Sequence, residues 1–148
     1  MVCLRVPGNG RVNPSPPLVK NLRWLKWKKS AYTRCNRRST LQYLEKLIAY
    51  PTVSRDSNLA LIAFVESELK ALGIASTLIH NEDGRKANLW ATIGPADKAG
   101  VALSAHTDVV PVEGQNWSSD PFQLRARDGT YYGRGSAYMK GFITACLH

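Results

Sequence analysis

The sequence predicts an α/β fold in which helices pack on a mixed, largely parallel sheet. Two segments with apolar residues at helical spacing come first, and a set of short, strand-like segments follows before a last helical segment. Helices, a strand set and a further helix in this order are typical of layered α/β domains. The chain has 148 residues, which is the usual size of one compact domain.

Two helices are expected early in the folded part of the chain. The first covers residues 40–49, because Ser39-Thr-Leu-Gln42 has the capping-box form S-x-x-Q and Pro51 discourages continuation. The second covers Asn58–Leu72, where apolar residues recur at helical spacing, and Gly73 is well placed to end it.

Three strands are expected to follow these helices. Ile74–His80 and Ala87–Ile93 have extended patterns, and the turn-forming residues Asn81-Glu-Asp-Gly84 separate them. Val101–Ala105 is short and apolar except for Ser104, which is the pattern of a strand covered on both faces.

The last third of the sequence predicts a hairpin and a further helix. Asp128-Gly129 stands between the strand-like segments Phe122–Arg127 and Thr130–Tyr132, and this dipeptide strongly favours a tight hairpin turn. Ser136–Leu147 has the character of the start of another helix.

Positive charge is concentrated at the N-terminus. Residues 1–38 hold ten Lys and Arg and no acidic residue, whereas residues 39–148 hold the other ten and all eleven Asp and Glu; the sums of +10 and −1 give the net charge of +9. We therefore expect 1–38 to be a basic extension, disordered or non-native, outside a nearly neutral domain at 39–148. A mitochondrial-type presequence remains open, as does a membrane-surface or RNA-binding arm built on Trp24 and Trp27.

The composition excludes several classes of protein. No window of about 18 apolar residues predicts a transmembrane helix, and the N-terminus lacks a secretory signal pattern. Three scattered cysteines fit reduced intracellular thiols better than a disulfide framework, so a cytoplasmic location is expected. Because the presumed domain has no basic face, no nucleic-acid or membrane partner is expected for it.

A His-x-Asp pair follows the strand at Val101–Ala105. Residues two apart in an extended chain face the same side, so His106 and Asp108 should project together from the carboxyl end of this strand, where open α/β sheets place their sites. A neutral imidazole is a good zinc ligand, and a neighbouring carboxylate can fix its tautomer. Such a pair is also common as a simple hydrogen-bonded loop pair.

Three longer stretches resemble one known family. Leu44–Ser54, Val101–Pro111 and Gly133–Gly141 are similar, in order and spacing, to signatures of the zinc-dependent superfamily of acetylornithine deacetylases, succinyl-diaminopimelate desuccinylases and aminoacylases/carboxypeptidases. The loop Pro111–Phe122 is most similar to that of the acetylornithine deacetylases. The resemblance implies an N-terminal, truncated part of a zinc-exopeptidase-like catalytic domain.

The resemblance also implies a reaction and its partners. The family hydrolyses amides with one or two Zn²⁺ or Co²⁺ ions, and acetylornithine deacetylases convert N²-acetyl-L-ornithine and water to L-ornithine and acetate in arginine biosynthesis. The implied substrate is a small N-acylated amino acid. Family members are homodimers of a few hundred residues, so the dimerisation domain is expected beyond this chain, and the sheet is expected to keep an open edge.

Positions carried over from the family assign three site residues. His106 matches the first metal ligand, and Asp108 matches the supporting catalytic carboxylate. Tyr138 stands where the family has the metal-bridging aspartate of Gly-Arg-Gly-x-x-Asp-Met-Lys-Gly. A phenol has one oxygen and a reference pKa of about 10, so the two-metal site should be badly weakened. Arg134 and Lys140 are candidate site cations, or equally surface and ion-pair residues.

An alternative follows from the same comparison. The family's general-base glutamate and remaining metal ligands are expected further along than this chain reaches. The chain could therefore be a catalytically inactive remnant of the family, with the basic segment as a possible nucleic-acid or membrane-surface binding element.

Overall fold

The computed structural model describes residues 1–7, 39–95 and 97–148. It contains one four-stranded sheet, a separate two-stranded hairpin and three helices within these ranges. Most of the basic extension, including Trp24, Trp27 and Cys35, lies outside the described residues, so the interpretations attached to it stay predictions. No helix among the described residues is long and apolar enough to cross a membrane.

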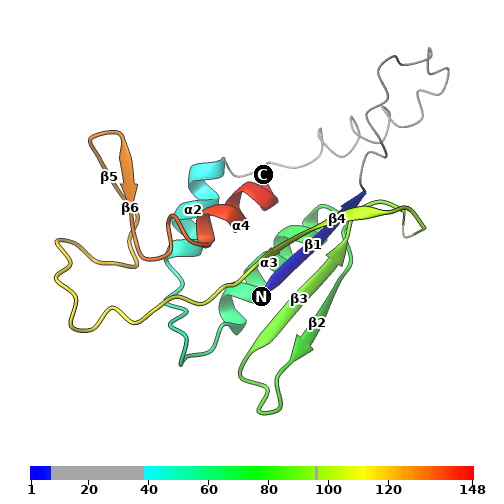
Figure 1. Cartoon of the computed structure of the whole chain (residues 1–148), viewed down its shortest axis with the longest axis horizontal. Coiled ribbons are helices and arrows are strands. Elements are labelled where there is room, and N and C mark those ends of the chain that lie inside the picture. Colours follow the sequence, from blue (N-terminus) through cyan, green and yellow to red (C-terminus); the bar gives the residue numbers. More distant parts are fainter. Residues whose placement is uncertain (8–38, 96) are drawn as a thin grey trace.

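The sheet is mixed, as predicted. Its strands are β1 (Val2–Pro7), β2 (Ser76–His80), β3 (Ala87–Thr92) and β4 (Gly100–Ala105), in the order β2-β3-β1-β4 (Figure 1). Strand β1 runs parallel to β3, while the pairs β1–β4 and β2–β3 are antiparallel. Parallel pairing is therefore confined to the β1–β3 pair, so the sheet is mixed but only partly parallel, where a largely parallel one was predicted.

Strand β1 departs from the sequence prediction. It lies inside the segment 1–38, for which no folded structure was expected, yet it occupies an inner position of the sheet with partners on both sides. Val2 and Leu4 alternate with Cys3 and Arg5, which is the period-two pattern of a strand. This alternation covers too few residues to predict a strand. The prolines and basic residues that follow it also favour an unfolded extension.

The helices begin and end close to the predicted residues. Helix α2 (Thr40–Ile48) has the predicted capping box, since the Ser39 amide donates to Gln42 Oε1 at 2.7 Å and the Gln42 amide donates to Ser39 Oγ at 3.3 Å. Helix α3 (Leu59–Ala71) is followed by Gly73, whose φ of +72° is the left-handed conformation that glycine adopts most easily. Helix α4 (Lys140–Leu147) ends at the predicted residue but begins later than the predicted Ser136, because residues 136–139 form a turn.

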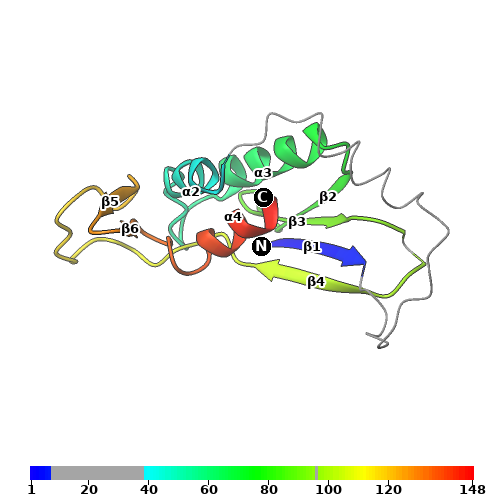
Figure 2. The ribbon, with the colours of Figure 1, turned by 90° about the horizontal axis from the view of Figure 1, so that it is seen from above.

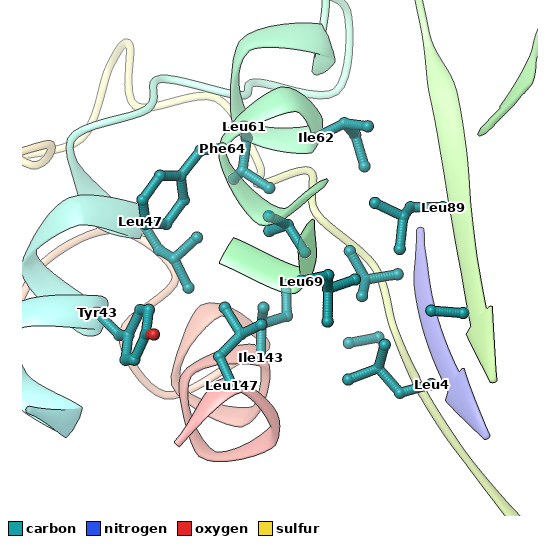
Figure 3. Close-up of a cluster of buried hydrophobic side chains, with 14 of the residues drawn as sticks. Leu4, Tyr43, Leu47, Leu61, Ile62, Phe64, Leu69, Leu89, Ile143 and Leu147 are labelled. Carbon is teal, nitrogen blue, oxygen red and sulfur yellow. The ribbon is translucent and has the colours of Figure 1, made fainter. Parts of the chain in front are cut away.

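The helices cover one face of the sheet (Figure 2). Helix α3 lies against β2 and β3, α4 lies against β4, and α2 packs on α4. A single apolar core fills the space between these layers (Figure 3). Its largest fully buried side chains include Leu4, Tyr43, Leu47, Leu61, Ile62, Leu69, Leu89 and Ile143.

The opposite face of the sheet is open among the described residues. Trp90 on β3 is 41% exposed and Ile79 on β2 is 58% exposed. The expectation that Val101–Ala105 is covered on both faces is wrong for this structure, because Ala102 and Ser104 are exposed on the open face and Val101 is 53% exposed. Small apolar residues suit a half-covered strand as well as a fully covered one, so this pattern could not separate the two.

The predicted hairpin is confirmed, with a shorter first strand. Strands β5 (Arg125–Arg127) and β6 (Thr130–Tyr132) pair antiparallel around Asp128 and Gly129. Both turn residues have positive φ, 51° and 73°, as a tight two-residue hairpin turn requires. The hairpin lies apart from the four-stranded sheet, on the far side of α2 (Figure 1).

Candidate active site

The candidate site lies where the chain leaves β4. After Ala105 the backbone runs beside residues 52–54, and Val53 and Val109 form a parallel bridge. The Val109 amide donates to the Thr52 carbonyl at 2.9 Å, and the Ser54 amide donates to the Val109 carbonyl at 3.0 Å. The segment after α2 therefore fixes the backbone that carries His106 and Asp108.

The structure brings His106 and Asp108 into contact, as the sequence pattern predicts. His106 Nδ1 lies 3.3 Å from Asp108 Oδ1 and 2.9 Å from the backbone oxygen of Asp108. Both side chains are partly exposed, and the contact orients the imidazole through Nδ1. Nε2 is then the ring nitrogen that Asp108 does not engage, and it is available to a ligand.

Ser54 holds the other carboxylate oxygen of this pair. Its hydroxyl donates to Asp108 Oδ2 at 2.8 Å. Partial burial acts to raise the pKa of Asp108, but the hydrogen bond from Ser54, the backbone amide of Asp108 and the contact with His106 together lower that pKa below its ordinary value. Asp108 is therefore ionised at neutral pH and favours one orientation of the imidazole.

A buried network of hydrogen bonds anchors Thr107, the residue between His106 and Asp108. Thr107 is buried, and its hydroxyl accepts a hydrogen bond from Asn58 Nδ2 at 3.0 Å. Asn58 also bonds both backbone groups of Ala87 on β3, at 2.9 and 3.0 Å. The Thr107 carbonyl accepts from Thr52 Oγ1 at 2.6 Å. These bonds leave Thr107 little freedom, so His106 and Asp108 are held from the backbone side.

Tyr138 lies next to His106. The centroids of the two rings are 5.1 Å apart, with the planes inclined at 58°. Tyr138 is 72% exposed, so it is not a packed core aromatic. The position where the resemblance expects a metal-bridging carboxylate is thus beside the His–Asp pair, and a large phenol ring occupies it.

The two glycines that flank Arg134 lie where a side chain would clash with neighbouring residues. A Cβ on Gly133 would come within 2.9 Å of the Ile48 side chain. Gly135 has φ of +83°, and a Cβ there would approach Val109 Cγ1 at 2.9 Å. Glycine is needed at both positions for the turn to pack on α2 and on the site loop.

The two candidate site cations have different environments. Lys140 is 1% exposed and its ammonium donates to the Tyr50 carbonyl at 2.6 Å, and burial lowers its pKa from 10.5 to about 8. Lys140 therefore ties α4 to the segment that supports Asp108. Arg134 donates to Gln115 Oε1 and stacks over Trp117, with its guanidinium carbon 4.9 Å from the ring centroid.

A cavity of about 400 Å³ joins these groups. Ser54, His106, Asp108, Arg134 and Tyr138 all line it, with Val109, Val110 and Gly135. All three predicted site residues therefore share one cavity. Sequence reasoning did not assign Ser54 a role, although it ends the stretch Leu44–Ser54 that carries part of the family resemblance.

The described residues do not form a complete zinc site. They contain no group of three or more His, Cys, Asp or Glu side chains that could hold a metal ion together. Structural and catalytic zinc sites use three or four such ligands. The local donor set is one imidazole, one carboxylate already engaged by Ser54, and one phenol.

Comparison with known proteins identifies relatives of the chain. Residues 102–148 match the model of peptidase family M20/M25/M40. Acetylornithine deacetylase of Pasteurella multocida (strain Pm70) is 42% identical over 112 residues, covering 71% of this chain and 29% of that protein. Acetylornithine deacetylase of Proteus mirabilis (strain HI4320) is 38% identical over 110 residues, covering 70% of this chain and 28% of that protein.

A relative named for another activity has a similar sequence identity. Succinyl-diaminopimelate desuccinylase of Stenotrophomonas maltophilia (strain K279a) is 43% identical over 101 residues, covering 68% of this chain and 26% of that protein. The chain thus spans less than a third of the length of the curated relatives it matches.

Proposed function

The chain carries a segment of peptidase family M20/M25/M40, and from this premise we propose that it provides the His–Asp part of an amide-hydrolase site for N-acylated amino acids. The observation that carries the proposal is the oriented pair: Asp108 engages Nδ1 of His106, and Ser54 and the buried Thr107 fix that arrangement. An imidazole with one nitrogen held by a carboxylate is the usual form of a metal-binding histidine.

Each residue then has a defined task. His106 offers Nε2 as a ligand for Zn²⁺ or Co²⁺, a metal that would supply Lewis-acid polarisation of the scissile carbonyl when bound. Asp108 keeps the imidazole in the tautomer with a proton on Nδ1. The cavity of about 400 Å³ holds a small acylated amino acid beside this pair. Acetylornithine deacetylase activity is our first choice of reaction because the loop Pro111–Phe122 is most similar to that of these enzymes.

Tyr138 favours a second proposal, which concerns this chain by itself. The described residues supply one imidazole and no set of three ligands, and the phenol replaces the expected bridging carboxylate. On this proposal the chain is an inactive remnant that binds zinc weakly and does not hydrolyse amides. The described residues by themselves do not complete a metal site that could carry out a catalytic step.

Calorimetric titration with zinc, followed by amidase assays, tests both proposals. The assays use N²-acetyl-L-ornithine and N-succinyl-diaminopimelate. We expect weak zinc binding by the natural chain, tighter binding by Tyr138→Asp, loss of binding in His106→Ala, and no turnover by any of them. Tyr138→Phe is the matched control, because it removes the phenol oxygen and adds no carboxylate.

The results distinguish the hydrolase proposal from the inactive-remnant proposal. Zinc binding that does not depend on His106 would refute the assigned ligand. Stoichiometric zinc binding with turnover by the natural chain would refute the inactive-remnant proposal and support the hydrolase directly. Preference between the two substrates would then decide between the deacetylase and the desuccinylase reactions.

A further inference from the structure

Arg134 is held at the cavity by neutral groups. Its guanidinium donates to Gln115 Oε1 and lies over the Trp117 ring at 4.9 Å. Trp117 Nε1 donates to the same Gln115 oxygen at 3.2 Å, and Gln115 Nε2 is fixed by the Pro111 carbonyl at 2.8 Å. Three residues of the loop after β4, namely Pro111, Gln115 and Trp117, therefore form a cradle that holds the Arg134 guanidinium.

No carboxylate among the described residues neutralises this guanidinium. The ion pairs of the described chain involve other side chains, such as Arg55 with Glu113 and Arg127 with Asp128. In addition, Arg134 Nε is completely buried and has no hydrogen-bond partner within the described structure. Because this donor has no accessible surface, a ligand would meet the rest of the guanidinium, whose charge no carboxylate of the described residues balances.

The cavity places this charge beside the His–Asp pair. Arg134 lines the same hollow as His106 and Asp108, whereas Asp108 already has Ser54 and His106 as partners. The fork of an arginine matches a carboxylate or a phosphate with two parallel hydrogen bonds. The Asp108 carboxylate in the same cavity repels a dianion more strongly than a monoanion, which favours a carboxylate over a phosphate.

We propose that Arg134 is a specificity-determining residue that binds the carboxylate of an N-acylated amino acid in the cavity it shares with His106 and Asp108. The choice of an acylated amino acid rests on the proposed function, while the selection of a carboxylate rests on the position of Arg134 in the cavity and on its charge, which no carboxylate of the described residues balances. Gln115 and Trp117 act as positioning residues, because they hold the guanidinium and leave its charge unneutralised.

Binding of two matched probes to the metal-free, full chain tests this inference. N-acetylglycine carries a carboxylate, and N-acetylglycinamide has nearly the same shape without the charge. NMR of the arginine Nε–H groups and of the Trp117 indole N–H reports binding at the cradle without any need for turnover. We expect N-acetylglycine to shift both signals saturably and to bind at least about tenfold more tightly than the amide.

Arg134→Gln should abolish this preference for the carboxylate, and Arg134→Lys should reduce it, since lysine keeps the charge and loses the fork. Arg125→Gln is the control: Arg125 also donates to a glutamine side chain, Gln123, but does not line this cavity. It should leave the preference unchanged. Circular dichroism melts verify folding, and if Arg134→Gln does not fold, Arg134→Lys and the probe pair decide the question.

Equal binding of the acid and the amide would overturn the inference, as would an unchanged preference in Arg134→Gln or in a folded Arg134→Lys. Tighter binding of inorganic phosphate than of N-acetylglycine would also overturn it. Failure of the proposed hydrolysis is a separate result: carboxylate-selective binding without turnover leaves the assignment of Arg134 standing. Turnover without that selectivity refutes only the assignment of Arg134.

Discussion

Single hydrogen bonds determine the properties of the site. The pKa of Asp108 is lowered although partial burial opposes this, and Ser54 makes the largest of the contributions that lower it. A carboxylate whose pKa is depressed in the folded state adds stability above its ordinary pKa, and this stability is lost as the pH falls through the folded value. Ser54 thereby also extends downwards the pH range over which Asp108 orients His106.

Removing the Ser54 hydroxyl tests this effect. In Ser54→Ala, the pKa of Asp108 should rise, and the acid-unfolding transition should move to higher pH, because Oδ2 loses its donor. Titration of the Asp108 carboxyl carbon by NMR measures the shift. Ser104→Ala, at an exposed position on β4, serves as the control and should leave the pKa of Asp108 unchanged. An unaltered pKa in Ser54→Ala would show that the hydrogen bond contributes nothing.

At the scale of residues, the sequence predicts the His106–Asp108 pair but not the side chains that hold this pair in place. His106 and Asp108 are two residues apart after a strand-like run, so a local pattern was sufficient to place them together. Ser54, Thr52 and Asn58 contribute through contacts with residues far away in the sequence. No local periodicity records such contacts. From the sequence, Arg134 is equally a site cation or a surface residue, because only the fold places Gln115 and Trp117 around it.

The main surprise among the elements is strand β1. Leu4 is 1% exposed and belongs to the same core as Leu61, Leu69 and Leu89 (Figure 3). Helices α2 and α3 could be predicted because capping residues and helical spacing are local signals. A six-residue strand that pairs only with distant segments has no comparable local signal. The basic, proline-rich composition of the surrounding segment indicates an unfolded extension instead. The order of strands in the sheet was beyond prediction for the same reason.

Truncation of Leu4 measures how much β1 contributes. Leu4→Ala should lower the free energy of unfolding by about 2–5 kcal/mol, since it leaves a cavity between the sheet and the helices. Leu41→Ala is the matched control, because Leu41 is 44% exposed on α2, and it should cost no more than about 0.5 kcal/mol. Urea denaturation monitored by circular dichroism provides both values. Similar values for the two variants would mean that β1 is not a structural part of the core.

The stability of the whole molecule should depend on Lys140. Its pKa falls from 10.5 to about 8 on folding because the ammonium is buried. Below about pH 8 both states carry the proton and the cost of burying the charge is complete; between about pH 8 and 10.5 only the unfolded chain holds the proton. The contribution of this residue to stability therefore becomes more favourable as the pH rises, by up to about 3 kcal/mol.

Comparison with Lys140→Met isolates this dependence. Other groups titrate equally in both proteins. The Tm of the natural chain should therefore rise relative to the Tm of Lys140→Met as the pH increases from about 8 to 10.5. Differential scanning calorimetry over this range measures the gain. A difference in Tm that stays constant with pH would contradict the lowered pKa.

We expect the unpaired edge of the sheet to favour association between molecules. Strand β4 pairs with β1 on one side and with no other strand of the described chain, and Val101 is exposed. Unprotected edge strands promote pairing between molecules, and a lysine on such an edge opposes it. Val101→Lys should reduce concentration-dependent association in analytical ultracentrifugation, and more so than Val101→Thr, which adds no charge. Unchanged association in Val101→Lys would exclude this edge as the contact.

The position of β1 also affects the order of events during synthesis. Val2 pairs with Leu89 on one side and with Ala105 on the other, so β1, which precedes the other three strands of this sheet in the sequence, has both edges paired only after β3 and β4 have left the ribosome. Pairings between such distant segments form slowly. Until β3 and β4 have emerged, Val2 and Leu4 lack their sheet partners, so these apolar residues stay exposed during that part of synthesis.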